Sequence, residues 1–331
     1  MRELSKRIAL AGLAAAALSC LVMAPAAAQD KVWKHALLNA KADAGFFMMS
    51  AKHGFAKKQG LDLQLLQVKD DQIGLKALLA GEVDSYEGGP QGVFAAAARG
   101  ADVKIVGCHW VVLPHGIYVR DDIHKVTDLK GKSIAVSAPN SMPDMLARFA
   151  LEKEGVDPAQ VKLAAVGGDR ERYQALVGGV VEGAVVSNEY QPEMPKTVHR
   201  LIAGRDALPN FLRVCMVTTG KVIKERGDDL VKFLAAEMQA LHYALSHKDD
   251  TVALTREIIH AKPDDPRPAF VYDDAVEHHA IDPDLPIPAD KLNWMQDQLV
   301  KVGKLKARLD LAAVSDDGPR EKALKPAGAG H

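Results

Sequence analysis

The sequence of 331 residues lacks an excess of charge of either sign. Its 42 Lys and Arg residues balance 43 Asp and Glu residues, and the formal net charge is −1 at pH 7. Proteins that bind nucleic acid or anionic membranes electrostatically carry a marked basic excess. The balance therefore argues against a nucleic-acid partner. Aromatic residues make up only 5% of the chain, but 48% of it is hydrophobic, which is enough for a core in two domains.

The chain also lacks the short motifs that hold phosphates or catalytic nucleophiles. It contains no G-x-x-x-x-G-K-[ST] segment and no G-x-S-x-G turn, and residues 88–92 (GGPQG) do not match G-x-G-x-x-G. The adjacent His278 and His279 do not share a helical face, so they do not predict a metal site. We therefore expect a protein without a cofactor, a metal or a catalytic function.

Cysteine is scarce, with residues at positions 20, 108 and 215. Cys108 and Cys215 each lie in an apolar, strand-like run. In an exported protein these two residues form a disulfide or stay as inert buried thiols. Both alternatives remain open, because a sequence does not give the separation that disulfide geometry requires.

A basic start followed by an apolar run marks the N-terminus. Arg2, Lys6 and Arg7 precede the apolar residues 8–23, which are too few for a comfortable membrane span, and residues 26–28 (AAA) supply a cleavage site. This pattern predicts a cleavable signal peptide over residues 1–28 and a periplasmic protein. The alternatives are an uncut anchor and a lipoprotein attached at Cys20.

Two stretches of the sequence repeat each other. HALLNAKADAGFFMMSAKHGFAKKQGLDLQLL, from His35, and SIAVSAPNSMPDMLARFALEKEGVDPAQVKLAAV, from Ser133, each indicate a strand, a helix that ends at glycine and a second strand. The repeat continues in ALLAGEVDSYEGGPQ, from Ala77, and ALVGGVVEGAVVSNE, from Ala175. Each half therefore predicts a β-α-β-α-β unit with a mostly parallel sheet, unless two common units are similar by chance.

Two such units predict an α/β protein with two lobes, each a mostly parallel sheet flanked by helices. Candidate strands near residues 197–204 and 211–220 indicate that the chain crosses between the lobes twice. We expect lobe one over residues 29–118 and 205–312, lobe two over residues 119–204, and a flexible tail over residues 313–331. Two crossings form a hinge that permits closure around a ligand.

Several segments resemble one known family. They are residues 44–47 (AGFF), 57–62 (KKQGLD), 77–84 (ALLAGEVD), 98–101 (ARGA), 128–132 (DLKGK) and 175–179 (ALVGG). Across residues 32–250 the sequence resembles the periplasmic solute-binding proteins of ATP-binding-cassette importers, in the branch with sulfonate, taurine, nitrate and thiamine-pyrimidine binders. The resemblance implies a type II two-lobed fold that closes on a small molecule and docks on a membrane permease.

Candidate ligand contacts lie where the predicted strands end, since ligands bind beyond the carboxyl ends of parallel strands. One of Phe46 and Phe47 offers an aromatic face while the other packs inside. Free amides at the start of the lobe-two helix favour an anion, for which Arg170 is the nearest arginine, and Glu189 suits an N–H donor. The full set is Asp43, Phe46, Phe47, Gly88, Gly89, Gln91, Trp110, His115, Ser137, Asn140, Ser141, Met142, Asn188, Glu189 and Tyr190.

These expectations favour a monomeric substrate-binding subunit of an importer. Its partners are a membrane permease and a small-molecule ligand, which is a sulfonate, an aromatic carboxylate or a pyrimidine-like compound. One alternative is an exported enzyme of the same fold, related to thiamine-pyrimidine synthases. Those synthases carry a cysteine-rich iron motif that three cysteines do not supply. The other alternative is a binder that serves a sensory receptor.

Overall fold

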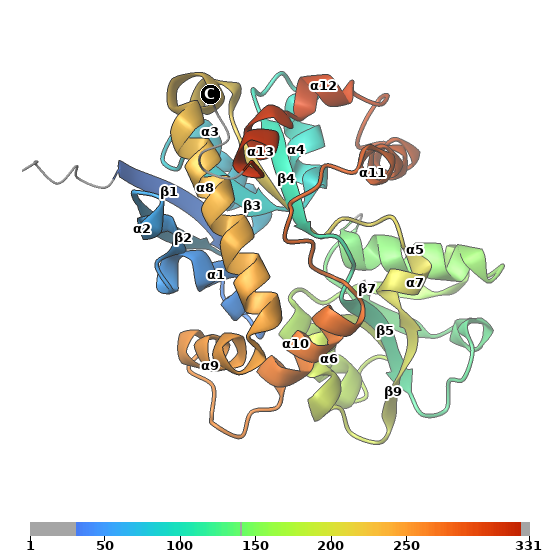
Figure 1. The fold of residues 1–331 in the computed structure, drawn as a ribbon. Helices are drawn as coiled ribbons and strands as arrows, with labels where there is room; N and C mark the ends of the chain where they lie inside the picture. The colour runs from blue at the N-terminus through green and yellow to red at the C-terminus, as the bar shows by residue number, and fades with distance from the viewer. Residues whose placement is uncertain (1–30, 140, 326–331) are drawn as a thin grey trace, which may run out of the picture.

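The computed structural model describes residues 31–139 and 141–325, and the predicted signal peptide lies outside these ranges. The chain forms two lobes, each built on a five-stranded mixed sheet (Figure 1). In sheet order, the lobe-one strands are β2 (Leu61–Val68), β1 (Lys31–Leu38), β3 (Ser85–Gly88), β10 (Val214–Thr218) and β4 (Lys104–Trp110). The lobe-two strands are β7 (Lys162–Ala165), β6 (Ser133–Val136), β8 (Gly183–Ser187), β5 (His115–Arg120) and β9 (Val198–Ala203).

The two sheets have the same strand order, so the internal repeat of the sequence is also a repeat of the fold. In each lobe three parallel strands adjoin an antiparallel fourth strand, which is β10 beside β3 and β5 beside β8. Gly81 and Gly179 close the helices before β3 and β8 with φ of 74° and 71°, a backbone conformation that glycine adopts without strain. The predicted two-lobed α/β fold is confirmed.

Helices cover both faces of each sheet. In lobe one, α3 (Asp71–Ala80) and α4 (Pro90–Ala97) cover one face, and α1 (Ala44–Lys52), α2 (Phe55–Lys58) and the long α8 (Gly220–Ser246) cover the other. In lobe two, α5 (Met142–Lys153) and α6 (Asp169–Val177) pack on the sheet. The short 3-10 helices are η1 (Val126–Leu129), η2 (Pro158–Gln160) and η3 (Asn188–Glu193).

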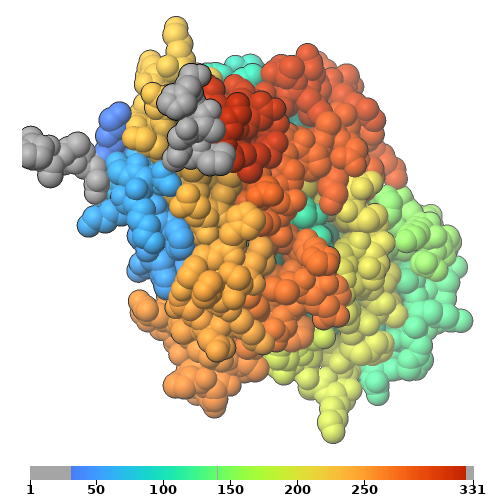
Figure 2. Space-filling model, viewed as in Figure 1, coloured from blue at the N-terminus to red at the C-terminus, as the bar shows by residue number. Residues whose placement is uncertain are grey.

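The C-terminal helices bridge the lobes. They are α9 (Lys248–Ile258), α10 (Arg267–Glu277), α11 (Ala289–Lys301), α12 (Leu311–Val314) and α13 (Gly318–Ala323). Helix α9 packs on α1 of lobe one, and α10 packs on η3 of lobe two. In the space-filling view, the orange C-terminal segment accordingly lies against both lobes (Figure 2).

The prediction of a flexible tail from residue 313 is wrong for the residues up to 325. Val314 is buried, the Lys104 Nζ donates to the Ala313 carbonyl over 2.6 Å, and α13 packs on α8. One buried valine and a few backbone contacts fix this segment. Its polar composition does not reveal them, because such contacts depend on a distant strand.

The chain crosses between the lobes at residues 111–114 and again just before β10. Strand β5 pairs with β8 and β9, so the first crossing precedes the predicted boundary at residue 118. The second crossing follows α7 (Gly204–Ala207). Cys108 and Cys215, on the two lobe-one strands that flank the crossings, form a disulfide. Of the helices in the described ranges, none combines the length and apolarity needed to span a membrane.

Candidate ligand-binding site

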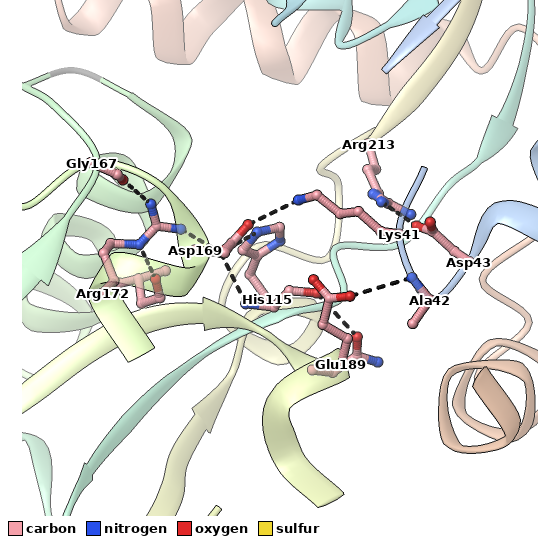
Figure 3. A network of polar contacts seen from close by, with 12 residues as sticks. Lys41, Ala42, Asp43, His115, Gly167, Asp169, Arg172, Glu189 and Arg213 are labelled. Atoms are coloured by element: carbon pink, nitrogen blue, oxygen red, sulfur yellow. Dashed lines mark hydrogen bonds and ion pairs between the residues drawn. The ribbon is translucent and has the colours of Figure 1, made fainter. Parts of the chain in front are cut away.

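The loop after β1 faces the segments after β7 and β8 where the lobes meet (Figure 3). The Lys41 Nζ of lobe one lies 3.1 Å from the Asp169 Oδ2 of lobe two. The Ala42 amide donates to the Glu189 Oε2 over 3.4 Å. These contacts join the carboxyl ends of strands from both sheets, where ligands of open α/β sheets bind. The described structure is therefore closed at this boundary.

Asp169 is the centre of the lobe-two side. It receives hydrogen bonds from Arg172 and from the Ser187 amide, and the His115 Nε2 lies 3.4 Å from its Oδ1. Burial raises the pKa of Asp169, but the charges and hydrogen bonds of His115, Lys41 and Arg172 outweigh burial and hold the pKa well below its usual range. Asp169 is thus a fixed negative charge to which Lys41 binds.

His115 and Glu189 flank this carboxylate. Burial lowers the pKa of His115, and the neighbouring Asp169 only partly opposes that effect. Burial likewise raises the pKa of Glu189, against the attraction of Lys41. The neighbouring Asn188 donates to the Asp274 Oδ2 of α10 over 2.7 Å, so it braces the C-terminal segment against lobe two.

Arg213 is the main cationic group of the lobe-one side. Its Nη2 donates to the Asp43 Oδ2 over 2.5 Å, and its guanidinium lies 4.2 Å from the centre of the Trp110 ring. Phe47 stacks on Trp110 with 5.5 Å between ring centroids. The Arg213 Nη1 is buried and has no hydrogen-bond partner within residues 31–139 and 141–325. A guanidinium fixed in this way still has N–H groups for an anion.

A cavity lies beside this arginine. We call it the Arg213 cavity, and it is lined chiefly by Leu37, Asn39, Lys41, Asp43, Phe47, Met48, Glu87, Gly88 and Arg213. A crevice that shares Lys41, Asp43 and Arg213 with it is also lined by Trp110, Ser187, Asn188 and Glu189. The predicted residues Asp43, Phe47, Gly88, Trp110, Asn188 and Glu189 thus come together here.

A second cavity, the Gln91 cavity, also lies between the lobes. It is lined by Gln91 of lobe one, by Ser137, Ser141 and Met142 of lobe two, and by residues of α11. Ser141 caps α5 by accepting from the Asp144 amide over 3.4 Å. Gln91 and the lobe-two loop therefore share one space, as the strand ends predict. Asn140, which belongs to the same prediction, lies outside the described residues.

Three predicted residues lie elsewhere. Phe46 is in the lobe-one core, 2% exposed and stacked on Tyr272. Tyr190 stacks on Tyr173 at 4.8 Å between centroids. Gly89 precedes α4, and a Cβ there would lie 2.4 Å from the Gln91 side chain. We leave these three out of the proposed site, because none of them lines the Arg213 cavity, its adjoining crevice or the Gln91 cavity.

The structure adds three residues that the sequence reasoning missed, namely Lys41, Asp169 and Arg213. Arg213 directly precedes the buried strand β10, and Asp169 follows two glycines at the start of α6. A charge next to a predicted strand is the available signal, and it leads only to the neighbouring Arg170. That side chain is exposed. Among the His, Cys, Asp and Glu residues described, no group of three is arranged to hold a metal ion.

Comparison with known proteins identifies a family for the sequence and a set of solved structures with the same fold. Residues 41–251 match the sequence profile of the family described as NMT1/THI5 like. No curated protein sequence matches the chain. The periplasmic aliphatic sulphonate binding protein SsuA from Escherichia coli superposes with a TM-score of 0.71, at 18% identity, over 86% of this chain and 92% of that chain.

Two further structures show the range of the fold. The alkanesulfonate-binding protein SsuA from Xanthomonas axonopodis pv. citri, bound to MOPS, has a TM-score of 0.67 at 17% identity and covers 87% of this chain and 99% of its own. The desulfurization enzyme DSZB has a TM-score of 0.70 at 15% identity, over 89% and 99%. At such identities the likeness shows a shared two-lobed periplasmic-binding-protein fold. Because the family profile matches well over half of the sequence, the chain belongs to the NMT1/THI5-like family.

Proposed function

We propose that this protein is the extracytoplasmic substrate-binding subunit of an ATP-binding-cassette importer. It captures a small organic solute with an anionic group, such as a sulfonate or an aromatic carboxylate, between its lobes. A membrane permease is its partner, and it works as a periplasmic monomer. The fold of the sulfonate-binding neighbours and the basic, apolar N-terminal segment support this proposal.

The observation that carries the proposal is the state of Arg213. The guanidinium lies over Trp110 and is held by Asp43, yet its buried Nη1 is without a protein partner in the described ranges. A buried, unpaired guanidinium N–H is costly, and a carboxylate or sulfonate oxygen satisfies it with a charge-assisted hydrogen bond. Phe47, which is stacked on the buried Trp110, lines the Arg213 cavity and offers an apolar surface to the rest of the solute.

Closure of the lobes supports the same proposal. The pairs Lys41–Asp169 and Ala42–Glu189 join the two rims beside the Arg213 cavity. Two segments of chain, residues 111–114 and the stretch between α7 and β10, connect the lobes and can serve as a hinge. A solute bound to Arg213 is then enclosed by residues of both lobes.

The test is a thermal-shift screen of the mature protein against sulfonates, aromatic carboxylates and pyrimidines, followed by calorimetry. A ligand at 1,000 times its Kd stabilises the folded state by about 4 kcal/mol. Replacing Arg213 with alanine removes charge-assisted hydrogen bonds, and we expect roughly tenfold to hundredfold weaker binding. Arg170→Ala is the matched control, because Arg170 is an exposed arginine near the same rim. Equal affinity in the two variants would contradict this role for Arg213.

The enzyme alternative has one observation in its favour, the shared fold of the desulfurization enzyme DSZB. Fold alone does not assign chemistry. Mass spectrometry of each bound compound after prolonged incubation distinguishes the two functions. An importer subunit returns its ligand unchanged, whereas repeated conversion of the ligand would show an enzyme.

A further inference from the structure

Glu87 is a buried carboxylate in the wall of the Arg213 cavity. It lies next to the end of β3 and is 3% exposed. Two histidines hold one of its oxygens, since the His109 Nε2 lies 3.1 Å and the His35 Nε2 lies 3.7 Å from Oε2. His35 in turn is fixed by a 2.7 Å contact between its Nδ1 and the Ser85 hydroxyl. The carboxyl group is therefore held rigidly in one orientation.

The other oxygen of Glu87 is not used by the protein. Both histidines approach Oε2, and Oε1 is buried without a hydrogen-bond partner in the part of the chain that the structure describes. A carboxylate accepts about four hydrogen bonds, and an unpaired buried oxygen carries a large desolvation cost. This geometry leaves one strong acceptor at the cavity wall.

The group is also an anion. Burial raises the pKa of Glu87, but the hydrogen bonds and charges of His109 and His35 outweigh burial and lower the pKa to about 2. The nearby Glu237 behaves in the opposite way, since burial and the charge of Glu87 raise its pKa to about 8. Near neutral pH this cluster therefore contains one fixed carboxylate, Glu87, whose free oxygen calls for a hydrogen-bond donor.

Arg213 supplies the complementary group in the same cavity. Strands β3 and β10 are neighbours, with Glu87 opposite Met216, so Arg213 lies three residues further along. At a rise of about 3.3 Å per residue, the two backbone positions are about 10 Å apart. Both residues line the Arg213 cavity, so a small molecule in that cavity can contact both groups.

We propose that Glu87 is a ligand-binding residue that accepts a hydrogen bond from an N–H group of the solute, while Arg213 binds its anionic group. The solute class is thus a small amino-sulfonate, amino-carboxylate or N–H heterocycle with an acidic group. This inference rests on the proposed function and narrows its ligand. Plain alkanesulfonates, which lack the donor, leave the Glu87 Oε1 unsatisfied and bind more weakly.

The first test uses the unaltered protein and matched pairs of compounds. The pairs are ethanesulfonate with 2-aminoethanesulfonate, propanoate with 3-aminopropanoate, and benzoate with 4-aminobenzoate. We expect the amino member of at least one pair to bind at least tenfold more tightly. N-methylation that removes every N–H and keeps the charge, to a trimethylammonium group for the alkyl amines and a dimethylamino group for 4-aminobenzoate, should cancel the gain. Equal affinity within every pair that binds would overturn the inference.

The second test is Glu87→Gln, with Glu237→Gln as the control for a change in the same buried cluster away from the cavity lining. We expect Glu87→Gln to abolish the tenfold preference for the amino member. Glu237→Gln should keep the preference. A preference that survives Glu87→Gln would overturn the inference. If Glu87→Gln does not fold, the affinities of the unaltered protein for the N-methylated compounds test the inference in its place.

The two proposals fail in different ways. Binding of the plain members as tightly as the amino members contradicts only the role of Glu87. Absence of binding by every compound of the thermal-shift screen, the three pairs included, contradicts the proposed capture of small organic anions, and with it the inference about Glu87.

Discussion

Cys108 on β4 lies directly opposite Cys215 on β10, and a disulfide joins them. The first crossing leaves lobe one after β4 and the second returns into β10. The bond, between residues 107 positions apart, therefore closes a loop that contains the whole of lobe two. The disulfide joins β4, after which the first hinge segment begins, to β10, before which the second hinge segment ends. Both hinge ends lie next to the Arg213 cavity.

Removal of this disulfide should destabilise the protein without changing its fold. For a loop of about 100 residues, loop-closure entropy predicts a loss of about 5 kcal/mol as an upper value. The measurement is urea unfolding of the unaltered protein and of the double variant Cys108→Ala/Cys215→Ala, with and without a reductant. A reductant should lower the midpoint of the unaltered protein and leave that of the double variant where it is. Identical urea midpoints for the unaltered protein and the double variant, both measured without reductant, would exclude a stabilising disulfide.

The Lys41–Asp169 pair should stabilise the closed arrangement. Lys41→Ala removes this contact between the lobes, while Arg172 still holds Asp169, so the fold should persist. We expect ligand affinity to fall about threefold to tenfold, as for loss of a partly exposed ion pair. Small-angle scattering should show a larger radius of gyration. Lys132→Ala is the control, since its pair with Asp122 lies within lobe two. A loss of affinity of the same size in both variants would argue against a role in closure.

Gly88 is required by packing within lobe one. A Cβ at this position would lie 1.8 Å from the Tyr86 hydroxyl oxygen and 2.4 Å from the Asp71 Oδ1. These two groups are hydrogen-bonded to each other over 2.5 Å, so they do not move apart freely. Gly88→Ala should cost about 1–3 kcal/mol of unfolding free energy.

Gly92→Ala is the matched control for this substitution. A Cβ at Gly92 would meet only the Leu75 Cδ2, at 3.8 Å, and the position lies inside helix α4. The change should therefore be neutral or stabilise by up to about 1 kcal/mol. Thermal unfolding of both variants checks the pair, and a Gly88→Ala protein as stable as Gly92→Ala would show that the backbone yields at no cost.

The duplicated fold could be predicted because the sequence signals that specify it are local. The helix-ending glycines, the apolar strands and the offset between the two halves are visible in the sequence, and the structure places Gly81 and Gly179 at equivalent turns. Each of these signals depends on neighbours a few residues away. Local propensity and hydrophobic period agree with the final structure here, as expected for a foldable sequence.

The binding residues were harder to predict because their partners are remote in the sequence. Phe46 and Phe47 are adjacent on α1, and Phe46 packs against Tyr272 and Trp110 while Phe47 lines the cavity. Arg213 faces Asp43 across 170 positions, and Lys41 faces Asp169 across 128. A single charged residue has no periodic pattern, so its role appears only when the crossings bring the strands together.

Glu237 should give the protein a stability that falls as pH rises. Burial, together with the charge of Glu87, raises the pKa of Glu237 from 4.5 to about 8, so the folded state binds an extra proton between these values. By linkage, the contribution of Glu237 to the free energy of unfolding is therefore largest below pH 4.5. It decreases by up to about 1.4 kcal/mol per pH unit between pH 4.5 and pH 8, and it is constant above pH 8. Glu237→Gln removes this titration. The difference in unfolding free energy between the two proteins, from urea titrations at pH 5 to 9, should therefore favour the unaltered protein most at the acid end. A difference that does not change with pH would show that Glu237 titrates alike in the folded and unfolded states.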